Sequence, residues 1–117
     1  MGVSSLPDYK QVIVYNKNSK IPFNDCLKYI VLGSLNSVEA SVNSSRVKVE
    51  SWLKFGQKKV TLQIPNESDL LSLQKLCNNK KIVNVLVKND QQVPCILVLG
   101  PDLEKILDPL TGKLRLF

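Results

Sequence analysis

Lysine, aspartate and cysteine are the residue types with which this chain could do chemistry, because its 117 residues include no histidine. The absence of histidine excludes Ser-His-Asp and Cys-His catalysis, histidine-containing zinc sites and imidazole pH switches. The remaining reactive side chains gather in three segments of the chain. They are Lys17, Lys20, Asp25, Cys26 and Lys28 in segment 16–28, Asp90 in segment 88–93, and Asp108 in segment 100–117.

Each of these side chains has both a functional and a structural interpretation. Lys20 could hold a carboxylate or a phosphate, or it could be a solvated loop lysine. Asp108 could orient a lysine or a water molecule, or it could bind local backbone N–H groups before Pro109. Cys26 lacks a basic partner, since Lys28 points elsewhere on a helix, so we expect a small buried residue rather than a nucleophile.

A basic cluster lies between residues 46 and 59, where Glu50 is the only opposing charge. Its cations are Arg46, Lys48, Lys54, Lys58 and Lys59. Cations beside aromatic residues such as Trp52 and Phe55 suit RNA, through phosphate contacts and base stacking. The helical spacing of Trp52 and Phe55 is, however, more often that of a hydrophobic core than of a stacking platform.

Composition limits the class of protein. A formal charge of +6 permits attraction to a polyanion and is also compatible with a lysine-rich surface. No apolar run approaches the roughly 18–20 residues of a membrane span, and the first residues do not resemble a secretory signal. Three cysteines at unrelated spacings predict reduced, buried thiols. We therefore expect a cytoplasmic protein with no membrane contact, no metal and no cofactor.

The first half of the chain predicts one strand, one helix and a further segment of ambiguous type. β-Branched and aromatic residues predict a strand over 10–15, and polar residues ending in a proline predict a loop over 16–22. Asn24 is expected to cap a mostly apolar helix over 25–42. Segment 46–55 fits either a strand or a helix by its own pattern.

The second half predicts three strands and two helices. Alternating apolar residues predict a strand over 59–64, and Asn66 is expected to cap a helix over 67–78. Strands over 82–87 and 93–99 are joined by a hairpin turn, and the second, apolar on both faces, should be an interior strand. A Gly-Pro turn and a short helix follow.

This order predicts an α/β fold with a mixed four-stranded sheet between helical layers. We expect a flexible lead-in over residues 1–8 and a single domain over residues 9–117.

Two blocks of the sequence carry a distinctive pattern. One is the ending Asp-x-x-Thr-Gly-x-Leu-x-Leu, which begins at Asp108. The other is Trp-x-x-x-Gly-Gln-x-Lys-Val from Trp52, followed by Pro-Asn-Glu-x-x-Leu from Pro65. Together these blocks resemble type 2 peptidyl-tRNA hydrolases. The resemblance covers about residues 10–117, implies the three-layer fold of that family, and favours a helix over 46–55. The Arg-Leu-Phe ending and a short turn before the last strand resemble the loop-shortened branch of peptidyl-tRNA hydrolase domain-containing proteins.

The resemblance also implies where a site should lie. The family has a lysine- and glycine-rich loop leading into Gln-Cys-x-His, a loop resembling Asp-Ala-Gly-Arg-Thr, and a C-terminal helix with an aspartate. Here Cys26 matches the family cysteine, while Asp25 and Lys28 stand where the glutamine and histidine are expected. Lys20 is the candidate for the family lysine in a loop about three residues shorter. Asp90 remains in the second loop, without the arginine and threonine.

These losses favour a catalytically impaired domain that binds tRNA, another RNA or a protein partner. The alternative is an active esterase that cleaves the peptide–tRNA ester with Lys20 and Asp108 as its working pair. The RNA-binding candidates are Lys17, Lys28, Lys54, Lys58 and Lys59. The resemblance also makes a homodimer a possibility, because family members often pair.

Overall fold

The computed structural model describes residues 8–117. The flexible lead-in predicted for residues 1–8 lies outside them, apart from Asp8, which is exposed. None of the helices in the described range is long and apolar enough to cross a membrane.

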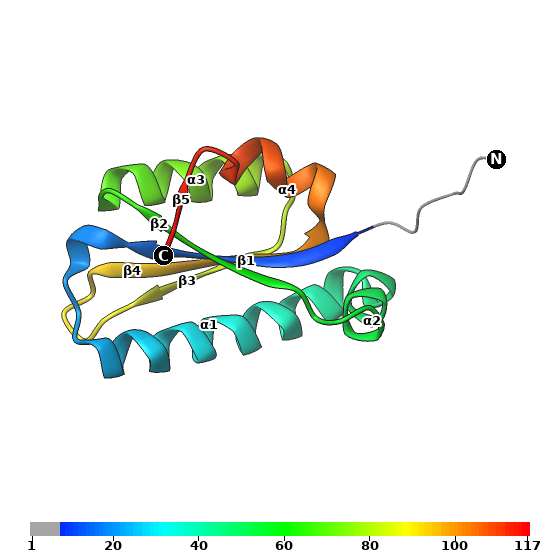
Figure 1. Ribbon diagram of the computed structural model, residues 1–117, viewed down its shortest axis with the longest axis horizontal. Coiled ribbons are helices and arrows are strands. Elements are labelled where there is room, and N and C mark those ends of the chain that lie inside the picture. The colour runs from blue at the N-terminus through cyan, green and yellow to red at the C-terminus, as the bar shows by residue number, and fades with distance from the viewer. Residues whose placement is uncertain (1–7) are drawn as a thin grey trace.

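The described chain builds one mixed sheet of five strands (Figure 1). The strands lie in the order β3-β4-β1-β2-β5. Strand β1 is parallel to β2, and the other neighbouring pairs are antiparallel. The strands are β1 (Tyr9–Asn16), β2 (Lys59–Ile64), β3 (Asn84–Lys88), β4 (Pro94–Leu103) and β5 (Arg115–Leu116). The predicted α/β class and mixed sheet are confirmed, but the predicted count of four strands is wrong because β5 pairs with the outer edge of β2.

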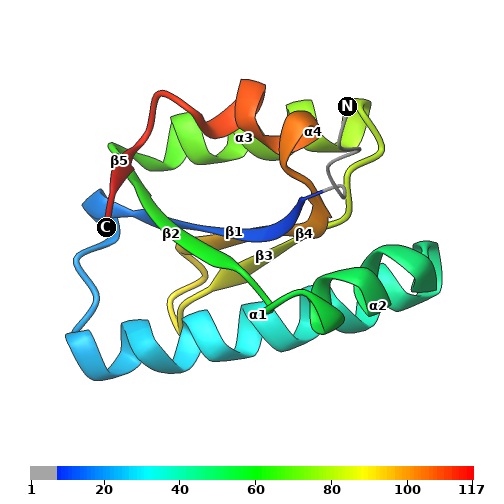
Figure 2. The same cartoon turned by 45° about the vertical axis from the view of Figure 1, so that its right-hand side comes forward.

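Helices cover both faces of this sheet. In Figures 1 and 2, α1 and α2 lie on one face, and α3 and α4 lie on the other. The helices are α1 (Phe23–Ser44), α2 (Arg46–Lys54), α3 (Glu67–Asn79) and α4 (Glu104–Thr111), and a 3-10 turn, η1 (Lys17–Ser19), follows β1. The helix favoured by the family resemblance over 46–55 is therefore confirmed.

Strand β4 is buried on both faces, as expected for an interior strand. Leu97 and Leu99 join the core that packs under α3 and α4, together with Leu70 and Leu107. The alternate residues of β4 join the second core, under α1, with Cys26. The period-2 alternation of a strand thus sends neighbouring apolar residues into two separate cores.

Two helix starts test the cap predictions. Asn66 caps α3 as predicted, because its Oδ1 accepts a hydrogen bond from the backbone N–H of Asp69 at 2.8 Å. Asn24 does not cap α1: the helix begins at Phe23, directly after Pro22, and Asn24 lies in its first turn. Pro22 precedes the helix without a side-chain cap, and its carbonyl accepts the first helical hydrogen bond, from the Cys26 N–H at 2.9 Å.

The predicted turn at Gly100-Pro101 is wrong, because β4 continues through it to Leu103. The pairing of β4 with β1 shifts register between Lys10 and Val12, so the irregularity is absorbed as a bulge. Gly100 has φ +81°, and a Cβ there would lie 2.6 Å from the Asp102 backbone nitrogen. A glycine is therefore required at this point of the strand.

Candidate active site

Two of the three segments that carry chemistry meet at one end of the sheet. Because β1 and β4 are antiparallel, the end of β1 lies beside the start of β4. The buried Asn16 holds them together, since its Nδ2 donates to the Pro94 carbonyl at 2.9 Å. Its Oδ1 accepts from the backbone N–H of Asn18 at 3.0 Å, and its carbonyl accepts from the Ser19 hydroxyl at 2.7 Å. Asn16 thereby fixes the loop that leads to Lys20.

The turn between β3 and β4 is ordered by its own asparagine. The Oδ1 of Asn89 accepts from the backbone N–H groups of Gln91 and Val93, both at 2.9 Å. The backbone N–H of Asn89 donates to the Val93 carbonyl at 3.0 Å. These bonds define the path of the turn and therefore the position of Asp90 within it.

The two ordered segments and the first turns of α1 line an open surface pocket of about 240 Å³, which we name the Lys20 pocket. It is lined by Ser19, Lys20, Ile21, Pro22, Asp25, Tyr29, Asn89, Asp90 and Gln91. Lys20 has φ +51°, a left-handed conformation that is uncommon for a residue with a side chain. Such a conformation costs free energy and persists where the surrounding structure imposes it, often at functional sites.

The charges of the Lys20 pocket are of both signs. Asp25 forms an ion pair with Lys28 at 3.2 Å, between Oδ1 and Nζ. In the described chain, neither Lys20 nor Asp90 takes part in an ion pair within 4.0 Å. Burial, followed by the negative charges of Asp90 and Asp25, raises the pKa of the Tyr29 phenol above its ordinary value. The phenol therefore stays protonated at neutral pH and can donate a hydrogen bond.

The third segment lies elsewhere, so the structure does not bring Lys20 and Asp108 together. Asp108 instead forms an ion pair with Lys10, with 2.5 Å between Oδ1 and Nζ. Lys10 is near the start of β1 and Lys20 follows its end, so the strand alone separates them by about 20 Å. Helix α4 follows the end of β4. Because β4 runs antiparallel to β1, that end lies beside the start of β1. The topology therefore places the two members of the predicted working pair at opposite ends of β1.

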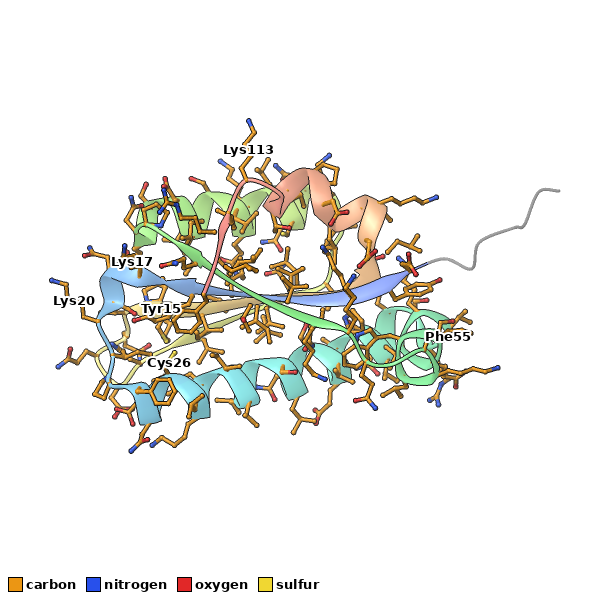
Figure 3. The ribbon with its side chains drawn as sticks, viewed as in Figure 1. Tyr15, Lys17, Lys20, Cys26, Phe55 and Lys113 are labelled. Carbon is orange, nitrogen blue, oxygen red and sulfur yellow. The ribbon has the colours of Figure 1, made fainter. Side chains whose placement is uncertain are left out.

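The predicted RNA-binding lysines are divided between the two ends of the molecule. Lys17 and Lys28 lie near the Lys20 pocket, whereas Lys54, Lys58 and Lys59 lie near Phe55 at the other end (Figure 3). Lys58 pairs with Glu104. Lys54 lies 5.6 Å from the ring centroid of the exposed Phe55, and Lys59 lies 4.9 Å from that of the buried Trp52.

The cysteines have a structural role. Cys26, Cys77 and Cys95 are buried free thiols, as predicted. Burial raises the pKa of all three thiols, and that of Cys77 and Cys95 reaches about 11. A protonated buried thiol is a poor nucleophile, so Cys26 is not a candidate for covalent catalysis. In residues 8–117 we find no cluster of three or more metal-ligating side chains.

Sequence reasoning did not assign a role to three residues of the Lys20 pocket: Asp25, Tyr29 and Asp90. Asp25 and Tyr29 are four residues apart and therefore share a face of α1. Asp90 lies in a hairpin turn, and nothing in the local sequence indicates which loop faces that turn. The turn is placed beside the loop that contains Lys20 by the antiparallel pairing of β4 with β1, which the local sequence does not reveal.

Comparison with known proteins agrees with this architecture. Residues 9–117 match the family model described as peptidyl-tRNA hydrolase PTH2. A peptidyl-tRNA hydrolase of Methanopyrus kandleri is 32% identical over 115 residues, covering 92% of this chain and 97% of that protein. Another of Thermococcus onnurineus is 29% identical over 117 residues, with coverage of 92% and 97%. The chain therefore belongs to the peptidyl-tRNA hydrolase PTH2 family.

Proposed function

We propose that this chain hydrolyses the ester bond between a peptide and the 3′ end of a tRNA, using the Lys20 pocket. The observation that carries this proposal is that Lys20 and Asp90, which come from two separate loops, line one pocket. Family membership supports the same substrate class. Fold alone does not define an activity, so the side chains of the pocket must be able to perform it.

Ester hydrolysis needs a base for the attacking water and positive charge or hydrogen-bond donors for the developing oxyanion. Asp90 supplies the carboxylate that takes a proton from water as its oxygen bonds to the ester carbonyl carbon. The Lys20 ammonium and the Tyr29 phenol supply the donors for the oxyanion. Collapse of this intermediate breaks the bond to the 3′ oxygen, which takes up a proton, and the peptide leaves as a carboxylic acid.

A domain that binds tRNA, another RNA or a protein without hydrolysis is the second candidate. The observation that favours it is the lining of the Lys20 pocket, which contains no glutamine, histidine, arginine or threonine at the positions where the family resemblance leads us to expect them. Lys28, at the histidine position, is exposed and paired with Asp25. Each lost donor typically contributes a few kcal/mol to lowering a barrier of this kind.

The deciding experiment is single-turnover hydrolysis of an N-acetylated aminoacyl-tRNA by the parent protein and by Lys20→Ala and Asp90→Asn. We expect release of the acyl group by the parent and a decrease of about 100-fold or more in each variant, since a positioned base typically contributes that much. Release at the spontaneous rate by folded parent protein would contradict the esterase proposal and favour the binding module.

Matched controls separate the pocket from general charge. Lys75→Ala removes an exposed lysine on α3, and Glu39→Gln neutralises an exposed carboxylate on α1. Neither residue lines the Lys20 pocket, so both controls should hydrolyse the substrate at the parent rate. Circular dichroism of each variant establishes that it remains folded.

A further inference from the structure

A second pocket lies at the edge of the sheet, beside the same end of β1. Its volume is about 350 Å³, and we name it the Lys113 pocket. It is lined by Lys17, Gln63, Ile64, Pro65, Lys113, Leu114 and Arg115. All three charged residues in this lining are cations.

The sheet topology creates this pocket. Strands β1 and β2 are parallel, so their carboxyl ends lie side by side, with Asn16 paired to Ile64. Lys17 therefore begins its loop next to Pro65. Strand β5 returns along β2 and pairs Arg115 with Gln63, which places the segment after α4 against the same edge. The cations come from chain segments almost one hundred residues apart, and the edge of the sheet brings them together.

Strand β5 is held in place by specific bonds. Gln63 Nε2 donates to the Leu116 carbonyl at 2.9 Å, and the backbone N–H of Phe117 donates to the Thr61 carbonyl at 3.0 Å. Leu114 is partly buried against the core beneath α3. The neighbouring Lys113 and Arg115 are exposed, because the core contact of Leu114 leaves them on the outside.

The positive charge of the Lys113 pocket is not compensated. Within the described residues, none of the four ion pairs includes Lys17, Lys113 or Arg115, and no carboxylate lines the cavity. Cations that converge on a concave surface without acidic neighbours create a local positive potential that attracts anions. In Figure 3, Lys17 lies at this end of the sheet, and Lys113 lies on the segment that follows α4, with its side chain directed away from the sheet.

The Lys113 pocket adjoins the Lys20 pocket through the chain itself. Lys17 lines the first and Lys20 lines the second, and three residues of chain span at most about 10 Å. We propose that the Lys113 pocket binds backbone phosphates of tRNA close to the 3′ end whose ester occupies the Lys20 pocket. This inference rests on the proposed function.

An aromatic pair on the same strands favours nucleic acid over an acidic peptide. The rings of Tyr15 and Phe117 stack with their centroids 4.5 Å apart, and Phe117 is 49% exposed. Tyr15 pairs with Gln63 in the sheet, and Phe117 follows Arg115 by two residues. An exposed aromatic ring beside backbone-binding cations is the arrangement by which proteins stack an unpaired base.

The test is the salt dependence of binding to deacylated tRNA. One variant carries Lys17→Gln, Lys113→Gln and Arg115→Gln; a matched control carries Lys75→Gln, Lys80→Gln and Lys105→Gln. Each lowers the formal charge from +6 to +3, and the control residues line neither pocket. We expect the slope of log affinity against log salt to become less steep by about 2 to 3 in the first variant and to change little in the control.

Three outcomes would overturn the inference. The first is an equal change of slope in both triple variants, which would mean a general charge effect. The second is the absence of measurable tRNA binding by the parent at low salt. The third is binding of polyglutamate that depends on the same three residues and is tighter than that of tRNA, which would point to an acidic protein.

Measurements of hydrolysis by the same variants distinguish a wrong inference about the Lys113 pocket from a wrong proposed function. If both hold, the Lys17, Lys113 and Arg115 variant should raise KM about tenfold or more at nearly unchanged kcat, because a phosphate contact is the same in the ground and transition states. Hydrolysis that needs Lys20 and Asp90 but has equal KM in both triple variants would overturn the inference alone. Pocket-dependent tRNA binding without hydrolysis would overturn the proposed function alone.

Discussion

The Nζ of Lys10 lies 2.5 Å from Oδ1 of Asp108 and joins the start of β1 to α4. The side chain of Lys10 is only 12% exposed, so its ammonium depends on this partner for much of its solvation. Asp108 belongs to the ending by which the sequence resembles its family. In this fold its carboxylate fastens α4 to the sheet and lies far from the Lys20 pocket.

We therefore predict that Asp108→Asn lowers the free energy of unfolding by about 1 kcal/mol, the upper part of the range for exposed ion pairs. Hydrolysis of acylated tRNA should stay within twofold of the parent. Urea denaturation and single-turnover hydrolysis measure the two quantities. A large loss of hydrolysis without a loss of stability would instead place Asp108 in the reaction.

The Tyr29 phenol should report on the charge of the Lys20 pocket. Burial and the negative charges of Asp90 and Asp25 raise its pKa, so it should deprotonate at a higher pH than a free tyrosine. Asp90→Asn removes one of these charges and should lower the Tyr29 pKa. Absorbance titration near 295 nm, with Tyr29→Phe to assign the signal, measures the change, and an unaltered titration would show that Asp90 is remote from Tyr29.

Gly33 allows α1 to approach the sheet closely. A Cβ at this position would lie 2.8 Å from Val98 Cγ2 and 3.0 Å from Val87 Cγ2. Gly33→Ala should therefore destabilise the protein by about 1–3 kcal/mol, the usual cost of overpacking, despite the better helix propensity of alanine. Asn36→Ala, at an exposed position of the same helix, is the control and should be nearly neutral or stabilising. The midpoint of urea unfolding discriminates between them.

The buried thiols of Cys77 and Cys95 should make the protein sensitive to alkaline pH. Their native pKa of about 11 exceeds the ordinary value of 9.0, so the unfolded chain loses these protons at a lower pH than the native chain. Their contribution to stability is complete below pH 9 and declines as pH rises towards 11. The midpoint of urea unfolding, measured between pH 8 and 11, should fall less steeply in the Cys77→Ala, Cys95→Ala variant. An identical decline would exclude the thiols as its cause.

Much of the fold follows from local sequence patterns. Alternation of apolar residues gives the bounds of β2, and the side chain of Asn66 marks the start of α3. Strand β5 could not be predicted from such patterns, because two residues are too few to show a periodic alternation. It forms only through its pairing with β2. The extension of β4 past Gly100 escapes it as well, because the bulge opposite Lys10 allows a proline inside a paired strand.

The site was predictable in part. Lys20 was identified from its loop, and the Lys20 pocket contains it. The structure places Asp108 at the other end of β1, because the order and direction of strands decide which loops meet, and one chain's local patterns do not contain that information. Asp90 was noted in its turn, but its place beside Lys20 follows only from β4 running antiparallel to β1.

The burial of β4 on both faces has a consequence for how the molecule opens. Alternate side chains of this strand belong to different cores, so neither core can separate from the sheet without exposing part of the other. The protein should consequently unfold as one cooperative unit, and the amide hydrogens of Ile96, Leu97 and Val98 should exchange with solvent only through global unfolding. The helices on opposite faces would then share a single stability, set by the strand between them.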